Sequence, residues 1–473
     1  MFFLWYNYVY MPLCSKKEVV SLLIVFLISF AFHLFNIQKP NRPAFDEVHF
    51  ATYAAEYARH EAHFDIHPPL GKLLYAAVLS LYPSSAYQDA NFIAINTRGE
   101  LKYSAIDRPF GNYPYVALRI LASLFGALLP ILGYVLLKNL TQNPFAPPLA
   151  AFFLLFENAL LMETRLILLN GMMLVFGILA LIFFFGKKQR VVFSGICLGL
   201  ALSVKLSAFV FAIVLFFGFM LEIPKKPFRA YDRDLGTVGG VALLVLGFFV
   251  AIHILIVSPA EQISVLRDLR TQMTPGLPAP WNTEPLFFQK IALFFKASIE
   301  QFNGMVAGYV VGTPTHVAMS PWYAWPFMSG GFSYSLFVPK TAPLFPLRVL
   351  FGSNAGQMGI VGNIFVWLSG TVAVLWSVWF SVRSKFNAKK FAGLAVLLAG
   401  WVAALLPFVS IVRRTSFLYH YFPALIFSIL LLAHWVGVLL TKLSPLKQKI
   451  LLAGIFLLTL GGFVLAAPYT YGL

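Results

Sequence analysis

Two adjacent acids, Asp46 and Glu47, stand just after the first long apolar segment of the chain. Neighbouring helical residues point about 100° apart, so these carboxylates do not flank one sugar as a glycosidase pair does. One carboxylate is enough for a direct displacement in which it takes a proton from a hydroxyl while a phosphate leaves. The other would pair with a cation and hold the loop. The alternative interpretation is that Asp46 caps a helix and Glu47 favours its positive end.

Three histidines, His60, His63 and His67, follow this pair and enclose Asp65. Their spacing would place them on one helical face, as a metal site requires, but Pro68 interrupts the last turn. We therefore expect no metal here, although the residues leave the need for a divalent metal open. We expect Asp65 and His67 to fix a turn between two helices.

The composition identifies the elements that must position these residues. The chain has 473 residues, 59% hydrophobic and 11% charged, which excludes a soluble globular protein. Cys14 and Cys197 suggest no disulfide framework. Apolar segments long enough to cross a bilayer predict eleven membrane helices. They cover residues 19–37, 114–137, 146–161, 167–186, 191–204, 206–222, 235–257, 357–382, 391–411, 416–440 and 450–467.

The basic residues indicate how the chain is oriented in the membrane. Seventeen Lys and Arg fall in alternate short connections with only four acids, so these connections and the N-terminus are predicted to be cytoplasmic. The net charge of +17 then reflects topology rather than nucleic-acid binding. The predicted organisation is a transmembrane module (1–257) with an external loop (38–113), a large external loop (258–356) and C-terminal transmembrane helices (357–473).

The first external loop predicts two amphipathic helices on the outer membrane surface. Asp46 suits the start of the first, and Pro68-Pro69 would end it. The second would begin at Pro69 and continue through Leu81. An all-α polytopic membrane protein with surface helices in its first external loop is therefore the expected fold class.

The first loop also resembles that of the protein O-mannosyltransferases, a family of GT-C glycosyltransferases that use polyprenyl-phosphate mannose. The resemblance rests on FDEVHF at residues 45–50 and FDIHPPLGK at residues 64–72. It continues at Tyr115–Arg119, Ser320–Pro326, Gly362–Trp367 and Arg414–Leu425, and so covers nearly the whole chain. It implies a GT-C-like bundle, a catalytic Asp46, and Glu47 and Asp65 as supporting residues.

Two features depart from the family pattern. Asn170 follows Leu169 where an Asp is expected, which puts the role of residue 170 in doubt. The segment 258–356 is too short for the soluble insert of eukaryotic members, which points to a prokaryotic form in a plasma membrane.

A lipid-borne donor of this kind needs cations at headgroup depth. Arg119, Arg165, Lys205 and Arg414 fall at predicted outer ends of spans and are candidate phosphate ligands. Snorkelling to water, or pairing with Glu47 or Glu163, is the alternative. Candidate contacts to sugar or acceptor are Trp322, Trp325, His316 and His420, although aromatic belts at membrane interfaces are common.

The expected function is an inverting transfer of mannose from polyprenyl-phosphate mannose to Ser or Thr hydroxyls of exported polypeptides. Transfer of another sugar to a lipid or glycan acceptor is the alternative within enzymes. A transporter is the alternative outside them, but it would place ionisable residues near span centres, whereas the charges here gather at edges and outside.

Overall fold

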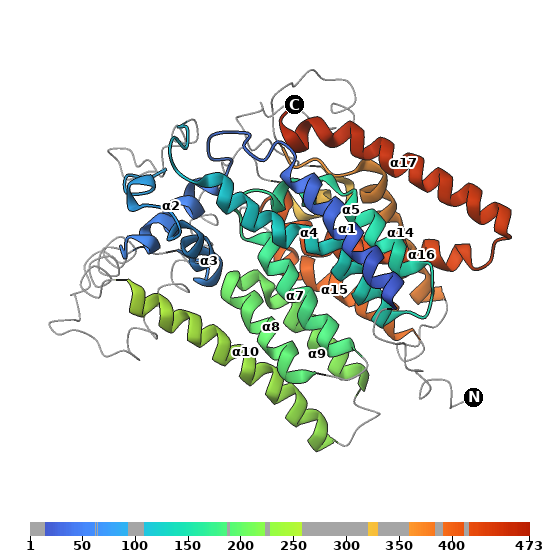
Figure 1. Ribbon diagram of the computed structural model, residues 1–473. Coiled ribbons are helices and arrows are strands. Elements are labelled where there is room, and N and C mark those ends of the chain that lie inside the picture. The colour runs from blue at the N-terminus through green and yellow to red at the C-terminus, as the bar shows by residue number, and fades with distance from the viewer. Residues whose placement is uncertain are drawn as a thin grey trace.

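The computed structural model describes residues 15–61, 63, 65–92, 108–186, 190–222, 228–257, 320–329, 359–383, 391–410 and 416–473. The regular elements in these ranges are helices (Figure 1). They are α1 (Lys16–Leu34), α2 (Glu47–Ala58), α3 (Leu70–Leu79), η1 (Ser84–Ala86), α4 (Tyr115–Leu140), α5 (Ala146–Leu155), α6 (Asn158–Thr164), α7 (Asn170–Phe185), α8 (Val191–Val204), η3 (Leu206–Ala208), α9 (Phe209–Glu222), α10 (Phe228–Ile256), η5 (Trp322–Phe327), α14 (Ile364–Arg383), α15 (Ala392–Ser410), η6 (Leu418–Tyr421), α16 (Phe422–Leu440) and α17 (Pro445–Tyr471).

Seven of these helices are long and apolar enough to cross a membrane, namely α1, α4, α10, α14, α15, α16 and α17. The pair α5 and α6, bent by 61° at residues 156–157, would make an eighth. Each of the eleven predicted segments overlaps an apolar helix, but α7, α8 and α9 are shorter. The chain is a multi-pass membrane protein, and the count of eleven crossings stays a prediction. The division into three domains likewise stays a prediction.

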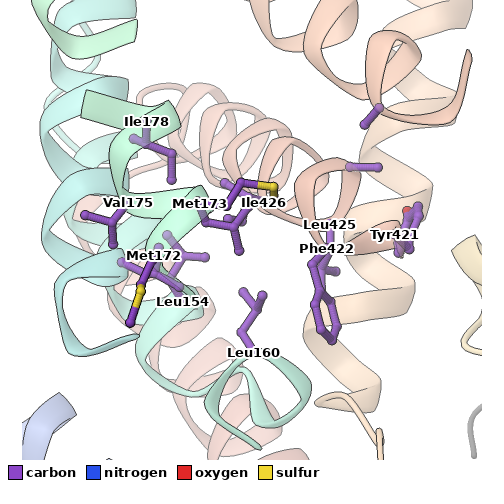
Figure 2. Close-up of a cluster of buried hydrophobic side chains, with 14 of the residues drawn as sticks. Leu154, Leu160, Met172, Met173, Val175, Ile178, Tyr421, Phe422, Leu425 and Ile426 are labelled. Carbon is purple, nitrogen blue, oxygen red and sulfur yellow. The ribbon is translucent and has the colours of Figure 1, made fainter. Parts of the chain in front are cut away.

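The bundle is built around α4, which packs against α1, α5 and α7. On one side of the bundle, α7 packs against α8, and α8 packs against α10. On the other side, α16 packs against α5, α14 and α15. The core between these groups is apolar: Figure 2 shows Leu154 and Leu160, four side chains of α7, and Phe422, Leu425 and Ile426 of α16. The two parts of the bundle are therefore joined by close hydrophobic packing.

The helices α2 and α3 lie together at one end of the bundle (Figure 1). The sequence expectation of two short helices in the first loop is confirmed, but α2 ends at Ala58 and not at Pro68-Pro69. The reason is local: His60 has a φ of 60°, a left-handed conformation that ends the helical hydrogen-bond pattern. Both helices bury much of their surface, since α2 and α3 pack against each other and α3 also contacts α4 and α8.

Candidate active site

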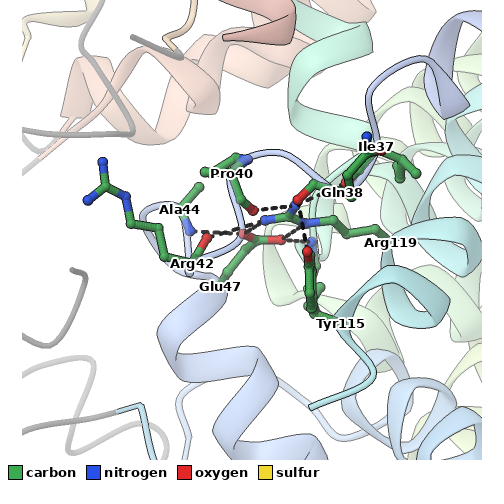
Figure 3. Close-up of polar contacts among 9 residues, drawn as sticks. Ile37, Gln38, Pro40, Arg42, Ala44, Glu47, Tyr115 and Arg119 are labelled. Carbon is green, nitrogen blue, oxygen red and sulfur yellow. Dashed lines mark hydrogen bonds and ion pairs between the residues drawn. The ribbon is translucent and has the colours of Figure 1, made fainter. Parts of the chain in front are cut away.

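A buried ion pair fixes the segment that leads into α2 (Figure 3). The Glu47 carboxylate accepts two hydrogen bonds from Arg119, at 2.9 and 2.7 Å, and one each from the backbone N–H of Ala44 and Ile167, both at 2.8 Å. Both side chains of the pair are fully buried. Glu47 therefore ties the first loop to α4 and to the connection between α6 and α7.

Arg119 has no N–H left for a ligand. Besides Glu47, its guanidinium donates to the carbonyl oxygens of Ile37, Pro40 and Arg42, so all five N–H groups are used. The structure thus shows the pairing with Glu47 that was the alternative expectation, and a role for Arg119 in binding a phosphate stays a prediction.

Asp46 differs from Glu47 in its hydrogen bonds and in its exposure. It occupies the N-cap position of α2, but its side chain makes no capping hydrogen bond, and no described residue donates one to its carboxylate. The side chain is only half-buried. Phe45, just before it, has a φ of 50°, which is rare for a bulky residue and costs on the order of 1–3 kcal/mol. The capping interpretation of Asp46 therefore does not account for this arrangement.

Charged groups surround the Asp46 carboxylate. Burial raises the pKa of Asp46, the nearby His49 and Lys205 lower it, and Asp65 raises it. Burial also raises the pKa of Asp65, but Lys72 and His67 outweigh this effect and lower it to about 2. The charged form of Asp65 is thus favoured, whereas Asp46 has a raised proton affinity, which suits a general base.

Lys72 explains how Asp65 and His67 are held. Its buried ammonium donates to the Asp65 carboxylate at 2.8 Å and to the His67 carbonyl at 2.7 Å, and it lies 5.5 Å from the centre of the Tyr53 ring. Burial lowers the pKa of His67 to about 3, and the charges of Lys205 and Lys72 act in the same direction. These contacts fix the turn that precedes α3.

Lys205 lies at the break between α8 and α9. Its ammonium donates to Asn170 Oδ1 at 2.9 Å and lies 5.1 Å from the centre of the Tyr419 ring. The Asn170 amide in turn donates to Glu163 at 2.6 Å. Lys205 is therefore the candidate phosphate ligand that the structure brings into electrostatic range of Asp46.

Residues from the late part of the chain complete the surroundings of Asp46. The Phe45 ring lies 5.9 Å from that of Phe417 and 5.8 Å from that of Tyr419. Neither Phe45 nor Tyr419 was among the candidate site residues predicted from the sequence. Their presence in the two motifs of the family resemblance was the signal that could have identified them.

The remaining sequence candidates fall in other places. Arg165 is buried, donates to the carbonyls of Thr470 and Phe35, and lies against the Tyr471 ring, so it holds α1, α6 and α17 together. A role for Arg165 in binding a phosphate stays a prediction. Arg414 and His316 lie outside the described residues.

The two tryptophans differ in exposure. Trp325 is fully buried, with its N–H donating to Ser320 and its ring against Phe408, and a contact between Trp325 and a sugar stays a prediction. Trp322 is half-buried and stays a candidate. The His420 ring lies against Trp325 and Tyr419, within the same aromatic group.

The histidines near the end of α2 contact α10. Tyr57 meets His253 Nδ1 at 2.6 Å, and His60 Nδ1 lies 3.1 Å from the Ile256 carbonyl. Within the described ranges, no group of three or more His, Cys, Asp or Glu side chains could hold a metal ion. The expectation of a site without metal stays a prediction.

Comparison with known proteins gives the family. A family model described as dolichyl-phosphate-mannose-protein mannosyltransferase matches residues 23–260, which is half of the chain. The chain belongs to this family. A second model, the C-terminal four TMM region of protein-O-mannosyltransferase, matches residues 287–473.

Among curated relatives, dolichyl-phosphate-mannose–protein mannosyltransferase 1 of Candida albicans is 31% identical over 200 residues, which are 40% of this chain and 21% of that protein. The matched region is thus about a fifth of the relative's length.

Solved structures give the fold. The protein O-mannosyltransferase Pmt1–Pmt2 complex of S. cerevisiae, solved bound to the sugar donor, matches with a TM-score of 0.74 and 17% identity, over 98% of this chain and 91% of that one. An Archaeoglobus fulgidus oligosaccharyltransferase with a tethered acceptor peptide matches with a TM-score of 0.54 and 16% identity, over 97% and 55% of the two chains. The GT-C-like fold predicted from the sequence is confirmed.

Proposed function

We propose that this protein transfers mannose from a polyprenyl-phosphate mannose to Ser or Thr hydroxyls of exported polypeptides, with inversion at the anomeric carbon. Family membership supports the donor and acceptor classes. The observation that carries the assignment of the base is the contrast between adjacent acids: Glu47 is saturated with hydrogen bonds, whereas the Asp46 carboxylate is half-buried and accepts none.

The proposed reaction is a single displacement. Asp46 takes the proton of the acceptor hydroxyl as its oxygen attacks the anomeric carbon, and the bond from that carbon to the phosphate oxygen breaks. The electron pair leaves with the polyprenyl phosphate. Lys205 stabilises the negative charge on that phosphate, because its ammonium lies close enough to act on Asp46.

The other residues have supporting roles in this proposal. Glu47 and Arg119 fix the backbone before Asp46, and Asp65, Lys72 and His67 fix the turn beside it. Trp322 and His420 are proposed contacts for the sugar or the acceptor. We place Asp46 on the extracytoplasmic side of a plasma membrane, with the N-terminus in the cytoplasm, in accord with the distribution of basic residues.

The test is transfer from labelled mannosyl polyprenyl phosphate to a Ser/Thr peptide, measured by mass spectrometry with purified full-length protein. Asp46→Asn should lower the rate about 100-fold or more, because general-base catalysis contributes that much, while donor binding is retained. The matched control is Asp89→Asn, an exposed acid of the same loop, which should transfer at the wild-type rate.

Full transfer by the Asp46→Asn protein would remove Asp46 from the mechanism. Label appearing in a lipid or glycan acceptor and not in the peptide would change the acceptor class. Repeating the assay with a chelator tests the expectation that no metal is required.

A further inference from the structure

The break between α5 and α6 holds a carboxyl group away from solvent. Glu157 is fully buried, and so are Asn158, Asn363 and Thr459 around it. These side chains come from the bend itself, from the start of α14 and from the middle of α17. None of them belongs to the group of residues around Asp46, and the proposed mechanism does not use them.

The two oxygens of Glu157 have unlike surroundings. Oε1 accepts hydrogen bonds from the backbone N–H of Ala159 at 3.1 Å and of Asn363 at 3.2 Å. Oε2 is buried and has no hydrogen-bond partner. No ion pair among the described residues includes Glu157. An ionised carboxylate is an acceptor at both oxygens, and burying it unpaired costs far more than protonating it.

A protonated carboxyl group accounts for this pattern. Its carbonyl oxygen accepts, as Oε1 does, and its hydroxyl oxygen needs an acceptor instead of a donor. Two other oxygens of these buried side chains lack partners: Asn158 Oδ1, on the adjacent residue, and Thr459 Oγ1. Asn363 joins Thr459 to this region, because its side-chain amide donates to the carbonyls of Phe156 and Thr459.

The packing around the carboxyl group is close. A Cβ at Gly362 would lie 2.7 Å from Glu157 Oε1, and a Cβ at Gly462 would lie 2.3 Å from Asn363 Oδ1. The two glycines thus allow α14 and α17 to approach the bend. Since polar groups in such a dry region must satisfy one another, the protonation state of Glu157 affects how the three segments fit.

We propose that Glu157 is held in its neutral, protonated form, with the proton on Oε2, as a positioning residue that locks α6 to α14 and α17. The end of α6 leads to Ile167, whose N–H donates to Glu47, so the neutral carboxyl group sets the placement of the segment beneath Asp46. This assignment goes beyond the proposed function and does not depend on it.

The experiment compares Glu157→Gln and Glu157→Ala in the full-length protein in nanodiscs. Glutamine keeps an acceptor at the position of Oε1 and places an N–H donor at the position of Oε2. The Glu157→Gln protein should therefore melt at the wild-type temperature, whereas the Glu157→Ala protein should melt at a lower temperature. The infrared difference between wild type and Glu157→Gln should contain a protonated-carboxyl C=O band that shifts in D₂O. Glu61→Gln is the control, since Glu61 is exposed and paired with Arg59, and it should remove only carboxylate bands.

A glutamine variant that unfolds together with the alanine variant would overturn the proposal, because it would show that a charge is required. A difference spectrum with carboxylate bands alone would do the same. The melting temperature of the wild-type protein should be the same in sodium, potassium and choline salts. If sodium or potassium raised the melting temperature of the wild type but not that of Glu157→Gln, a bound cation at this position would replace the proton that we propose.

Discussion

Asp46 and Glu47 are neighbours in sequence, yet the Glu47 carboxylate accepts four hydrogen bonds and the Asp46 carboxylate accepts none. The difference follows from helix geometry, since adjacent side chains at the start of α2 point in different directions. Glu47 faces α4, where Arg119 neutralises it in a fully buried pair. Removing one partner of such a pair costs about 3–5 kcal/mol. The Asp46 carboxylate accepts no hydrogen bond, and burial and the charge of Asp65 raise its pKa while His49 and Lys205 lower it.

Glu56, on the same helix, predicts a pH dependence of stability. Burial raises its pKa to about 7, with Arg59 and Lys72 lowering it and Glu61 raising it. Below about pH 4.5 the Glu56 proton is bound in both the folded and unfolded states, so the protonation of Glu56 costs the folded state nothing and its contribution to stability is at its largest. Between about pH 4.5 and 7 the unfolded chain has released this proton and the folded one still holds it, so stability falls as pH rises.

The expected size of this loss is about 2–3 kcal/mol, from roughly 1.4 kcal/mol per pKa unit. Melting temperatures at pH 5 and pH 8 measure it. Glu56→Gln should flatten this dependence relative to wild type, while Glu61→Gln, on an exposed side chain, should keep the wild-type slope. Equal slopes for Glu56→Gln and wild type would refute the assignment.

At the scale of elements, two glycines set the distance between α8 and α10. A Cβ at Gly195 would lie 2.9 Å from the Val238 carbonyl oxygen, and one at Gly199 would lie 2.7 Å from that of Ala242. They stand four residues apart, the small-xxx-small spacing of close helix pairs in membranes. This contact also positions the far end of α10, which holds α2 through His253.

Gly199→Ala should therefore destabilise the protein by about 1–3 kcal/mol, because the backbone of α10 has to move away. The measurement is thermal unfolding in detergent. Gly247→Ala, on α10, is the matched control: nothing lies within 4 Å of its added Cβ, so it should melt at or above the wild-type temperature. If the Gly199→Ala protein were as stable as the Gly247→Ala protein, the packing of α8 against α10 would have room for a methyl group at residue 199.

The elements were easier to predict from sequence than the contacts between them. Apolar runs located the seven helices that are long and apolar enough to cross a membrane, because the bilayer imposes length and composition. The glycine spacing of α8 leaves the hydrophobic pattern intact, so it was not predicted. The bend at Glu157 is marked only by the polar pair Glu157-Asn158 inside an apolar run, which by itself does not distinguish a bend from a continuous helix. At the site, the sequence predicted roles for Asp46, Glu47 and Asp65, but it left open whether Arg119 pairs with an acid or binds a phosphate, and whether Trp325 is exposed. Those properties depend on tertiary neighbours.

At the scale of the whole molecule, the predicted outer ends of the helices meet in space. The start of α2 contacts residue 167, its end contacts α10 near Ile256, and Lys205 lies against Tyr419. The predicted inner ends meet as well, since Glu18 at the start of α1 pairs with Lys138 at the end of α4. The alternation of sides read from the basic residues is consistent with both groups.

This orientation predicts a labelling pattern. With Cys14 and Cys197 replaced by serine, Asp89→Cys should react with an impermeant maleimide on intact cells, and Lys442→Cys only after permeabilisation. Both positions are exposed, and nine predicted spans separate them. Labelling of residue 442 from outside would show that one crossing, such as α8 or α9, has been miscounted.

The ring contacts of Phe45 with Phe417 and Tyr419 join the first external loop to a segment that is synthesised after all the middle helices. While the ribosome is still inserting those helices, Phe45 lacks these two ring partners. If Asp46 is the base that we propose, a nascent copy should therefore stay inactive until residues 417–419 have been inserted.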